Sequence, residues 1–262
     1  MPDGDSRCPR EEELLRRWIV VGSFSLVLLL AACFATYGLS RSRTYQLTGD
    51  LVSRVATAEK VVALTFDDGP GDSTPEILDM LAAAGVSATF YLNGADVDRH
   101  PEYGAAIARA GHEIGNHTYT HRRMMFVAPG TVVREVETTD AAIARTGYRG
   151  PITFRPPYGK KLWTLPHYLA ERERTTVMWD VAPDSAGTPD TGRIVDETTA
   201  NVRPGSIVLL HVMMPSRSAS RAAVPRIIER LRAEGYRFVT VSELLSYRPK
   251  RHGPLWCLWC PR

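Results

Sequence analysis

Short apolar runs alternate with amphipathic stretches along most of this chain. The runs that predict strands are Val61–Phe66, Ala88–Leu92, His112–Gly115, Ile152–Arg155, Thr175–Trp179, Ser206–Leu210 and Arg237–Val241. A glycine follows each amphipathic stretch, as is common at helix ends. The predicted helices are Pro75–Ala84, Glu102–Ala110, Thr131–Thr146 and Ala222–Glu234. Strands that alternate with helices predict an α/β fold with a mostly parallel sheet.

A long apolar segment precedes this alternation. It runs from Trp18 to Ser40 without a charged residue and exceeds the roughly 20 residues that cross a bilayer as a helix. A buried core helix would not usually be apolar all round at this length. More arginines lie before the segment than just after it, which favours an amino terminus inside the cell. We predict a cytoplasmic tail (1–17), a transmembrane anchor or uncleaved signal (18–40), and an extracytoplasmic remainder of a single-pass cell-membrane protein.

Two other fates of this segment compete with the retained anchor. Leu30–Cys33 resembles a lipobox, which would make a lipoprotein at Cys33, and a signal cut near Ala35 would release a secreted protein. The acidic residues before the segment and Phe34 after the cysteine weigh against both. All three fates export the rest of the chain.

Composition narrows the remaining choices. Residues 58–247 suffice for one hydrophobic core, with 41–57 as a linker that contains an extra strand or helix and 248–262 as a tail. A net charge of +3 is too small to indicate a nucleic-acid partner. The four cysteines all lie outside 58–247, and the pair Cys257 and Cys260 has no second pair with which to form a zinc site. We expect a monomer.

Polar residues that can perform chemistry follow the predicted strands. Asp67 and Asp68 follow the first predicted strand, at the end of the strand where α/β folds place their active sites. His117 and His121 are four residues apart, which predicts two imidazoles on one face of a helical turn. One carboxylate and two histidines make a three-ligand metal site open to water, and the other carboxylate is free to act as a base. Each motif alone has an ordinary structural explanation, whereas their combination favours chemistry.

Four ordered motifs resemble the NodB-homology group of polysaccharide deacetylases, carbohydrate esterase family 4. The motifs are Leu64–Pro70, Gly111–His121, Arg155–Gly159 and Ile207–His211. The resemblance covers roughly Ala58 to Tyr247 and implies a distorted (β/α)7 barrel of NodB type. The metal implied is a divalent ion held by Asp68, His117 and His121; we favour Zn2+, with Co2+ or Ni2+ as alternatives.

The resemblance also implies roles for the other motif residues. Asp67 matches the general base, Arg155 the arginine that orients this base, and the backbone N–H of Tyr158 a stabiliser of the oxyanion. His211 matches the general acid, and Leu209 lines the pocket for the acetyl methyl group. The aspartate that tunes the acid is Asp184, with Asp180 as the alternative.

The sequence departs from the family pattern at two places. Val212–Met214 follows His211 where an aspartate is frequent, and Ser185 stands where a tryptophan often follows the tuning aspartate. Both changes fall on the substrate side of the site. They therefore bear on specificity more than on activity.

The resemblance implies a metal-dependent hydrolase that removes N-acetyl groups from an envelope or extracellular polysaccharide, such as peptidoglycan or a chitin-like polymer. Metal-activated water would attack, with Asp67 as base and His211 as acid. O-deacetylation of xylan or another acetylated glycan is the alternative within hydrolases. A non-catalytic glycan-binding barrel, or a metal-sequestering or structural membrane protein, is the alternative from another class. The complete set of metal, base and acid residues argues against the last two, because binding alone does not require it.

Overall fold

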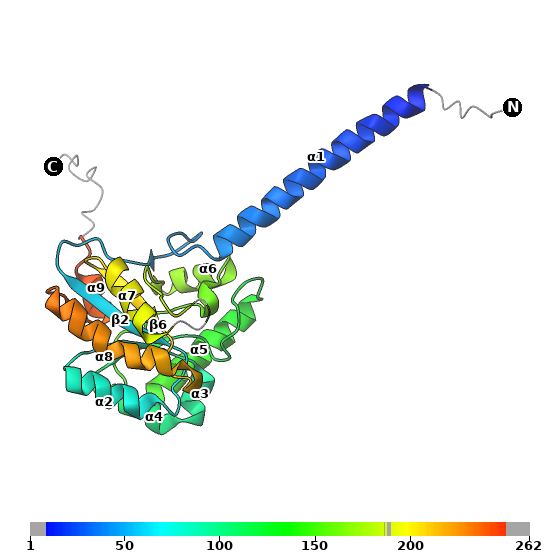
Figure 1. Ribbon diagram of the computed structural model, residues 1–262. Coiled ribbons are helices and arrows are strands. Elements are labelled where there is room, and N and C mark those ends of the chain that lie inside the picture. Colours follow the sequence, from blue (N-terminus) through cyan, green and yellow to red (C-terminus); the bar gives the residue numbers. More distant parts are fainter. Residues whose placement is uncertain (1–8, 186, 188–189, 250–262) are drawn as a thin grey trace, which may run out of the picture.

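The computed structural model describes residues 9–185, 187 and 190–249 (Figure 1). Helix α1, Pro9–Ser40, projects away from the remaining elements, which pack into one domain (Figure 1). It begins before the predicted anchor, and its stretch Arg16–Ser40 is long and apolar enough to cross a membrane. The predicted tail residues Cys257 and Cys260 lie outside the described residues.

The core of the domain is a parallel sheet built around β2. Strand β6 pairs with β2 along most of its length. Strand β3 pairs with the carboxyl-terminal half of β2, and β7 pairs with the amino-terminal half of β2. Strand β4 pairs with β3. These strands are β2 (Val61–Asp67), β3 (Thr89–Leu92), β4 (Glu113–Asn116), β6 (Ser206–Leu210) and β7 (Arg237–Val239). The predicted α/β class with a parallel sheet is confirmed.

The rest of the barrel wall is irregular. Within the predicted linker, β1 (Leu51–Val52) pairs with β5 (Thr176–Val177). The predicted strand at Ile152–Arg155 is wrong as a regular strand, because only Phe154 forms bridges there, to Asn116 and Thr176. Further single bridges, such as the one between Val181 and Val208, link this side to β6. The barrel is therefore distorted, with its regular pairing interrupted.

Helices cover the outside of the sheet (Figure 1). Four of them match predictions: α2 (Thr74–Ala84), α4 (Pro101–Arg109), α5 (Pro129–Arg145) and α8 (Ser218–Ala233). Four others were not predicted: α3 (Gly94–Arg99), α6 (Thr164–Glu171), α7 (Thr191–Asn201) and α9 (Val241–Ser246). Helices α3, α6 and α9 are short, and α7 has only Ile194 and Val195 as large apolar residues on its buried face, so the long apolar periodicity on which the prediction relied is missing.

Strand β2 is buried on both faces, and its two faces meet different neighbours. Val62, Leu64 and Phe66 join the core beneath the helices. Val61 and Ala63 join the smaller cluster inside the barrel. Since side chains alternate along a strand, Thr65 and Asp67 continue the inner row. In β6 the same alternation sends Ile207 inward with Leu209, and His211 follows in that row.

Candidate active site

The two neighbouring aspartates reach one site because the backbone changes conformation between them. Asp67 ends β2 on the inner row of side chains. Asp68 has a φ of 66°, in the left-handed region that non-glycine residues rarely adopt. Consecutive side chains of a regular strand point to opposite faces. The left-handed residue breaks this alternation, and both carboxylates line the same pocket.

The segment His117–His121 is a loop, so the predicted helical turn is wrong. Thr118 and His121 have φ values of 68° and 55°, which exclude a right-handed helix. The loop is held by Glu135 of α5, whose Oε2 accepts hydrogen bonds from the main-chain N–H groups of Tyr119 and Thr120 at 2.9 and 2.8 Å. The imidazoles nevertheless meet, with ring centroids 5.0 Å apart.

Asp68, His117 and His121 form a cluster that fits a divalent metal. Their candidate ligand atoms all lie within 4.8 Å of one another. Oδ1 of Asp68 is 3.2 Å from Nε2 of His121 and 3.8 Å from Nε2 of His117. This Oδ1 is buried and makes no hydrogen bond within the described chain. A buried carboxylate oxygen without a donor is costly, and a cation would satisfy it.

The environment of His117 suits a metal ligand. Its Nδ1 lies 2.7 Å from the main-chain oxygen of Arg155, which can only accept, so Nδ1 carries the proton. The pKa of His117 is lowered to about 3, and burial of the ring is the largest cause. The ring is therefore neutral at ordinary pH, and the lone pair of Nε2 faces the cluster.

Asp67 is held by a fully buried arginine. Nη1 of Arg155 donates to Oδ1 of Asp67 at 2.6 Å and to Oγ1 of Thr65 at 2.8 Å. The guanidinium lies 4.0 Å from the centroid of the Tyr91 ring, which supports its flat face. Burial raises the pKa of Asp67, and the charge of Arg155 opposes that rise. Arg155 thus fixes the direction of the carboxylate.

His211 is paired with Asp184. Oδ1 of Asp184 lies 3.1 Å from Nδ1 of His211, and Oδ2 accepts from the His211 main-chain N–H at 2.7 Å. Ser220 of α8 also donates to Oδ2, at 2.8 Å. The alternative residue, Asp180, is engaged elsewhere, because it accepts from the hydroxyl of Ser206.

One pocket of about 470 Å³ brings most of the predicted site together. The residues that line it are Arg41, Asp67, Asp68, His117, His121, Tyr158, Trp179, Ser185, Leu209, His211 and Arg217. Arg155 and Asp184 are fully buried and support this lining from behind. A second pocket of about 370 Å³ shares Asp68 and His121, and Met213 and Met214 contribute to its wall. The two departures from the family pattern therefore lie at pocket-lining positions.

Several residues of the site were missed by the sequence analysis. Arg41, Trp179 and Arg217 line the pocket, but none of them has the spacing or residue type of a metal or acid–base motif. Glu135 could have been found from the sequence, because its spacing places an acid on the same helical face as Val132 and Val136, and all three are buried in α5. A charged residue on an apolar helical face normally requires a partner.

The pocket of this distorted α/β barrel holds a carboxylate–histidine cluster, a second carboxylate and a histidine paired with an aspartate. These groups suit metal-assisted hydrolysis. The polysaccharide deacetylase family matches residues 54–176 of the chain. A peptidoglycan-N-acetylglucosamine deacetylase of Bacillus cereus is 35% identical over 204 residues, which are 77% of this chain and 95% of that protein. The chain belongs to the polysaccharide deacetylase family, and it is an enzyme of that family.

Two further relatives support the assignment. A chitooligosaccharide deacetylase of Sinorhizobium fredii is 35% identical over 199 residues, covering 71% of this chain and 92% of that protein. The crystal structure of the Bc1960 peptidoglycan N-acetylglucosamine deacetylase superimposes with a TM-score of 0.71 at 32% identity. The match covers 76% of this chain and 94% of that one. The NodB-type fold expected from the sequence motifs is thus confirmed.

Proposed function

We propose that this enzyme removes N-acetyl groups from an envelope polysaccharide such as peptidoglycan or a chitin-like polymer, with the help of one bound divalent metal. The observation that carries the proposal is a single pocket lined by the cluster of Asp68, His117 and His121 together with Asp67 and His211. The substrate class is supported by the names of the relatives, which act on peptidoglycan and chitooligosaccharides.

Three residues of the cluster would hold the metal, and two others would move protons. A divalent ion at Asp68, His117 and His121, with zinc preferred, supplies Lewis acidity toward water and the acetyl carbonyl when bound. Asp67 accepts the proton of the attacking water, because Arg155 directs its carboxylate and the charge of Arg155 opposes the rise in pKa that burial causes. The main-chain N–H of Tyr158 stabilises negative charge on the carbonyl oxygen.

His211 completes the reaction by donating a proton to the departing amine. Its Nδ1 is engaged by Asp184, which leaves Nε2 for the substrate. Leu209 is the next inner-row residue before His211, in position to contact the methyl of the acetyl group. The two adjoining pockets that share Asp68 and His121 suit a chain of sugars that extends on both sides of the reacting residue.

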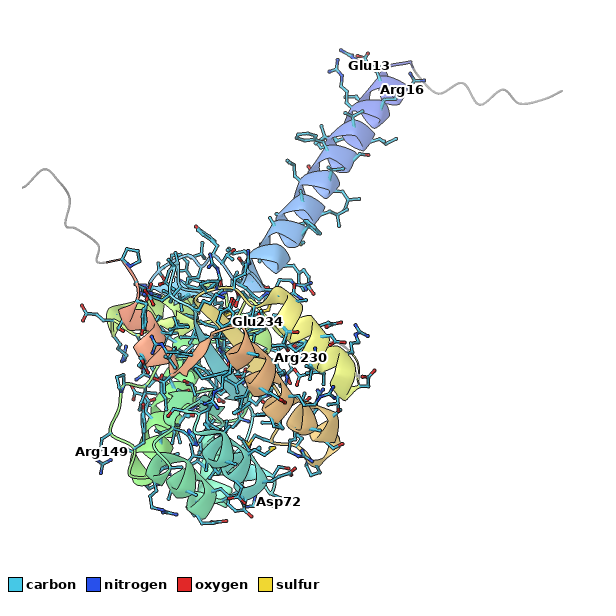
Figure 2. The ribbon with its side chains drawn as sticks, turned by 60° about the vertical axis from the view of Figure 1, so that its left-hand side comes forward. Glu13, Arg16, Asp72, Arg149, Arg230 and Glu234 are labelled. Carbon is cyan, nitrogen blue, oxygen red and sulfur yellow. The ribbon has the colours of Figure 1, made fainter. Side chains whose placement is uncertain are left out.

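The apolar stretch of α1 fits a retained membrane anchor with the domain outside the cell. Arg16–Ser40 is exposed over nearly its whole length, as a segment surrounded by lipid would be, and Arg16 lies at the end of α1 far from the domain (Figure 2). Residues 58–247 would then be the catalytic domain on the outer surface, where its polysaccharide lies.

Acetate release tests the proposed function. The full chain would be supplied with N-acetylglucosamine oligomers, peptidoglycan and acetylxylan at equal acetyl concentration. Release from the first two that exceeds release from acetylxylan supports N-deacetylation. Release only from acetylxylan would replace the amide substrate with an ester. No release from any of them, with metal bound, would overturn the assignment of substrate class.

A further inference from the structure

The loop that follows His121 carries two apolar side chains beside α1. Met125 and Phe126 line an apolar groove together with the α1 residues Ala32, Cys33, Thr36 and Tyr37. Phe126 is 79% exposed, which is unusual for phenylalanine in a water-soluble surface. Its φ of 51° is again left-handed, so the loop holds this residue in a strained conformation. This segment, residues 122–127, is called the 122–127 loop below.

The end of α1 is fastened to the domain, so this groove is built into the fold. The main-chain N–H of Lys161 donates to the carbonyl of Ser40 at 2.9 Å. The Lys161 ammonium donates to the carbonyl of Ser42 at 2.5 Å, although only 1% of the residue is exposed. A buried lysine that satisfies the carbonyls at the end of α1 fixes where the helix leaves the domain.

The position of the groove along α1 determines the level in the bilayer at which the groove would lie. At a rise of 1.5 Å per residue, Ala32–Tyr37 lie about 5–12 Å before Ser40 along the helix axis. The uncharged stretch Trp18–Ser40 is about 34 Å long by the same rise, close to the thickness of a hydrocarbon core of about 30 Å. A helix that spans the bilayer therefore places Met125 and Phe126 at the outer edge of the acyl chains.

We propose that the 122–127 loop inserts Met125 and Phe126 into the outer leaflet beside the anchor, so that the domain rests on the membrane surface. The proposal relies on the membrane anchor assigned under the proposed function. Arg122 and Arg123 are exposed next to the apolar pair, and the Lys160 ammonium lies 4.3 Å from the centroid of the Tyr37 ring. Cations and aromatic rings of this kind gather where headgroups meet acyl chains.

This placement directs the active site toward the membrane. His121 immediately precedes the loop, and the Arg123 guanidinium lies 4.6 Å from the centroid of the Tyr158 ring. Arg41, the first residue after α1, lines the pocket that contains Asp67 and His211. The pocket consequently opens near the outer membrane surface, and the enzyme acts on acetylated glycan within reach of that surface.

Photo-crosslinking to lipid tests the insertion with the unmodified full chain. The protein would be reconstituted in nanodiscs that contain a phosphatidylcholine with a diazirine near the middle of one acyl chain, and tryptic peptides would be analysed by mass spectrometry. We expect lipid adducts on α1 and on Met124–Arg134. We expect none on His100–Arg109, the tryptic peptide that contains α4, because α4 lies at the end of the domain away from α1 (Figure 1).

The other outcomes are equally informative. Adducts on α1 alone would overturn the insertion and leave the anchor intact. No adducts on either, with acetate release from soluble oligomers unchanged, would overturn the anchor and the insertion but not the deacetylase. A loop peptide without lipid adducts in nanodiscs that hold two chains each would replace the membrane with another copy as the occupant of the groove.

A pair of variants at Phe126 adds a matched control. Phe126→Glu should lower the lipid adducts of the loop peptide at least fivefold, whereas Phe126→Leu should retain them. Both variants should release acetate from soluble oligomers at the rate of the original chain, which shows that they fold. Equal labelling of the two variants would contradict insertion of this side chain.

Discussion

The carboxylate of Asp184 contacts His211 at two points. Its Oδ2 accepts a hydrogen bond from the main-chain N–H of His211 at 2.7 Å, and its Oδ1 lies 3.1 Å from Nδ1 of the ring. Asp184 itself is fully buried, so its charge acts on His211 with little screening by water. Burial lowers the pKa of His211, whereas the hydrogen bond and charge of Asp184 raise it, together with the charges of Asp67 and Asp68, and the pKa is raised overall. The pair therefore favours the protonated form of His211, which the proposed role of general acid requires.

Replacement of Asp184 should move the pH profile. Asp184→Asn keeps the shape but removes the charge, so the pKa of His211 falls. Because a general acid works only while protonated, the loss of kcat/KM at high pH should begin at a lower pH than in the original enzyme. At neutral pH we expect a drop of roughly 10²-fold. The measurement is kcat/KM against pH with a soluble oligomer.

Asp180→Asn is the matched control for this variant. Asp180 is partly buried, and it accepts hydrogen bonds from the hydroxyl of Ser206 and the N–H of Ile207 instead of contacting His211. We expect it to lower stability without moving the high-pH limb. The same shift in both variants would show that the profile does not depend on the pairing of Asp184 with His211.

The pair of Arg155 and Asp67 should show strong coupling in stability. Arg155→Met leaves a buried carboxylate without its cation and should destabilise the fold by about 3–5 kcal/mol. Adding Asp67→Asn to this variant should recover part of the loss, since the unpaired charge is gone. Thermal or urea unfolding of both single variants and the double variant measures this coupling. Strict additivity would contradict a direct interaction.

Glu135 should support metal affinity from outside the cluster. Glu135→Gln weakens the hydrogen bonds that hold Tyr119 and Thr120, and the position of His121 depends on them. We expect zinc affinity to fall by roughly 10–100-fold. Glu137 lies on the same helix and accepts a hydrogen bond from the hydroxyl of Tyr168, away from the cluster. The Glu137→Gln variant should therefore bind zinc normally. Competition with a chromophoric chelator gives both values, and equal affinities would refute the role of Glu135.

Gly115 makes room for the ring beneath Arg155. A Cβ at this position would lie 2.4 Å from Cε1 of Tyr91, inside any real contact distance. Gly115→Ala should therefore cost about 1–3 kcal/mol of stability through overpacking. Gly130→Ala in α5 meets only the end of a flexible arginine at 3.8 Å and should be neutral or slightly stabilising. Comparison of the two melting temperatures checks the clash.

Strand periodicity made much of the site predictable. Apolar runs located β2 and β6, and both carry a candidate functional residue at or just after their carboxyl ends. The inner row of each strand then brings Asp67 and His211 into one pocket. This worked because the side chains of an extended strand point alternately to its two faces whatever the sequence, so that residues two apart share a face.

Local backbone conformation was not predictable in the same way. The left-handed residues Asp68, His121 and Tyr158 create the convergence of the site, yet none is a glycine that would mark such a turn. The spacing of His117 and His121 suggested a helix, but the segment is a loop whose main-chain N–H groups donate tertiary hydrogen bonds to Glu135. Arg41 enters the pocket only because the end of α1 is fastened by Lys161, a contact between residues far apart in the chain.

The most direct test of the account is acetate release during metal titration. The full chain would be stripped with a chelator, then titrated with zinc while acetate release from N-acetylglucosamine oligomers and bound metal are measured together. We expect release to rise until one zinc is bound per chain. Asp67→Asn should bind the same zinc but lose roughly 10²–10⁴-fold in rate. Full activity of the stripped enzyme, or of Asp67→Asn, would contradict a metal-dependent deacetylase with Asp67 as its base.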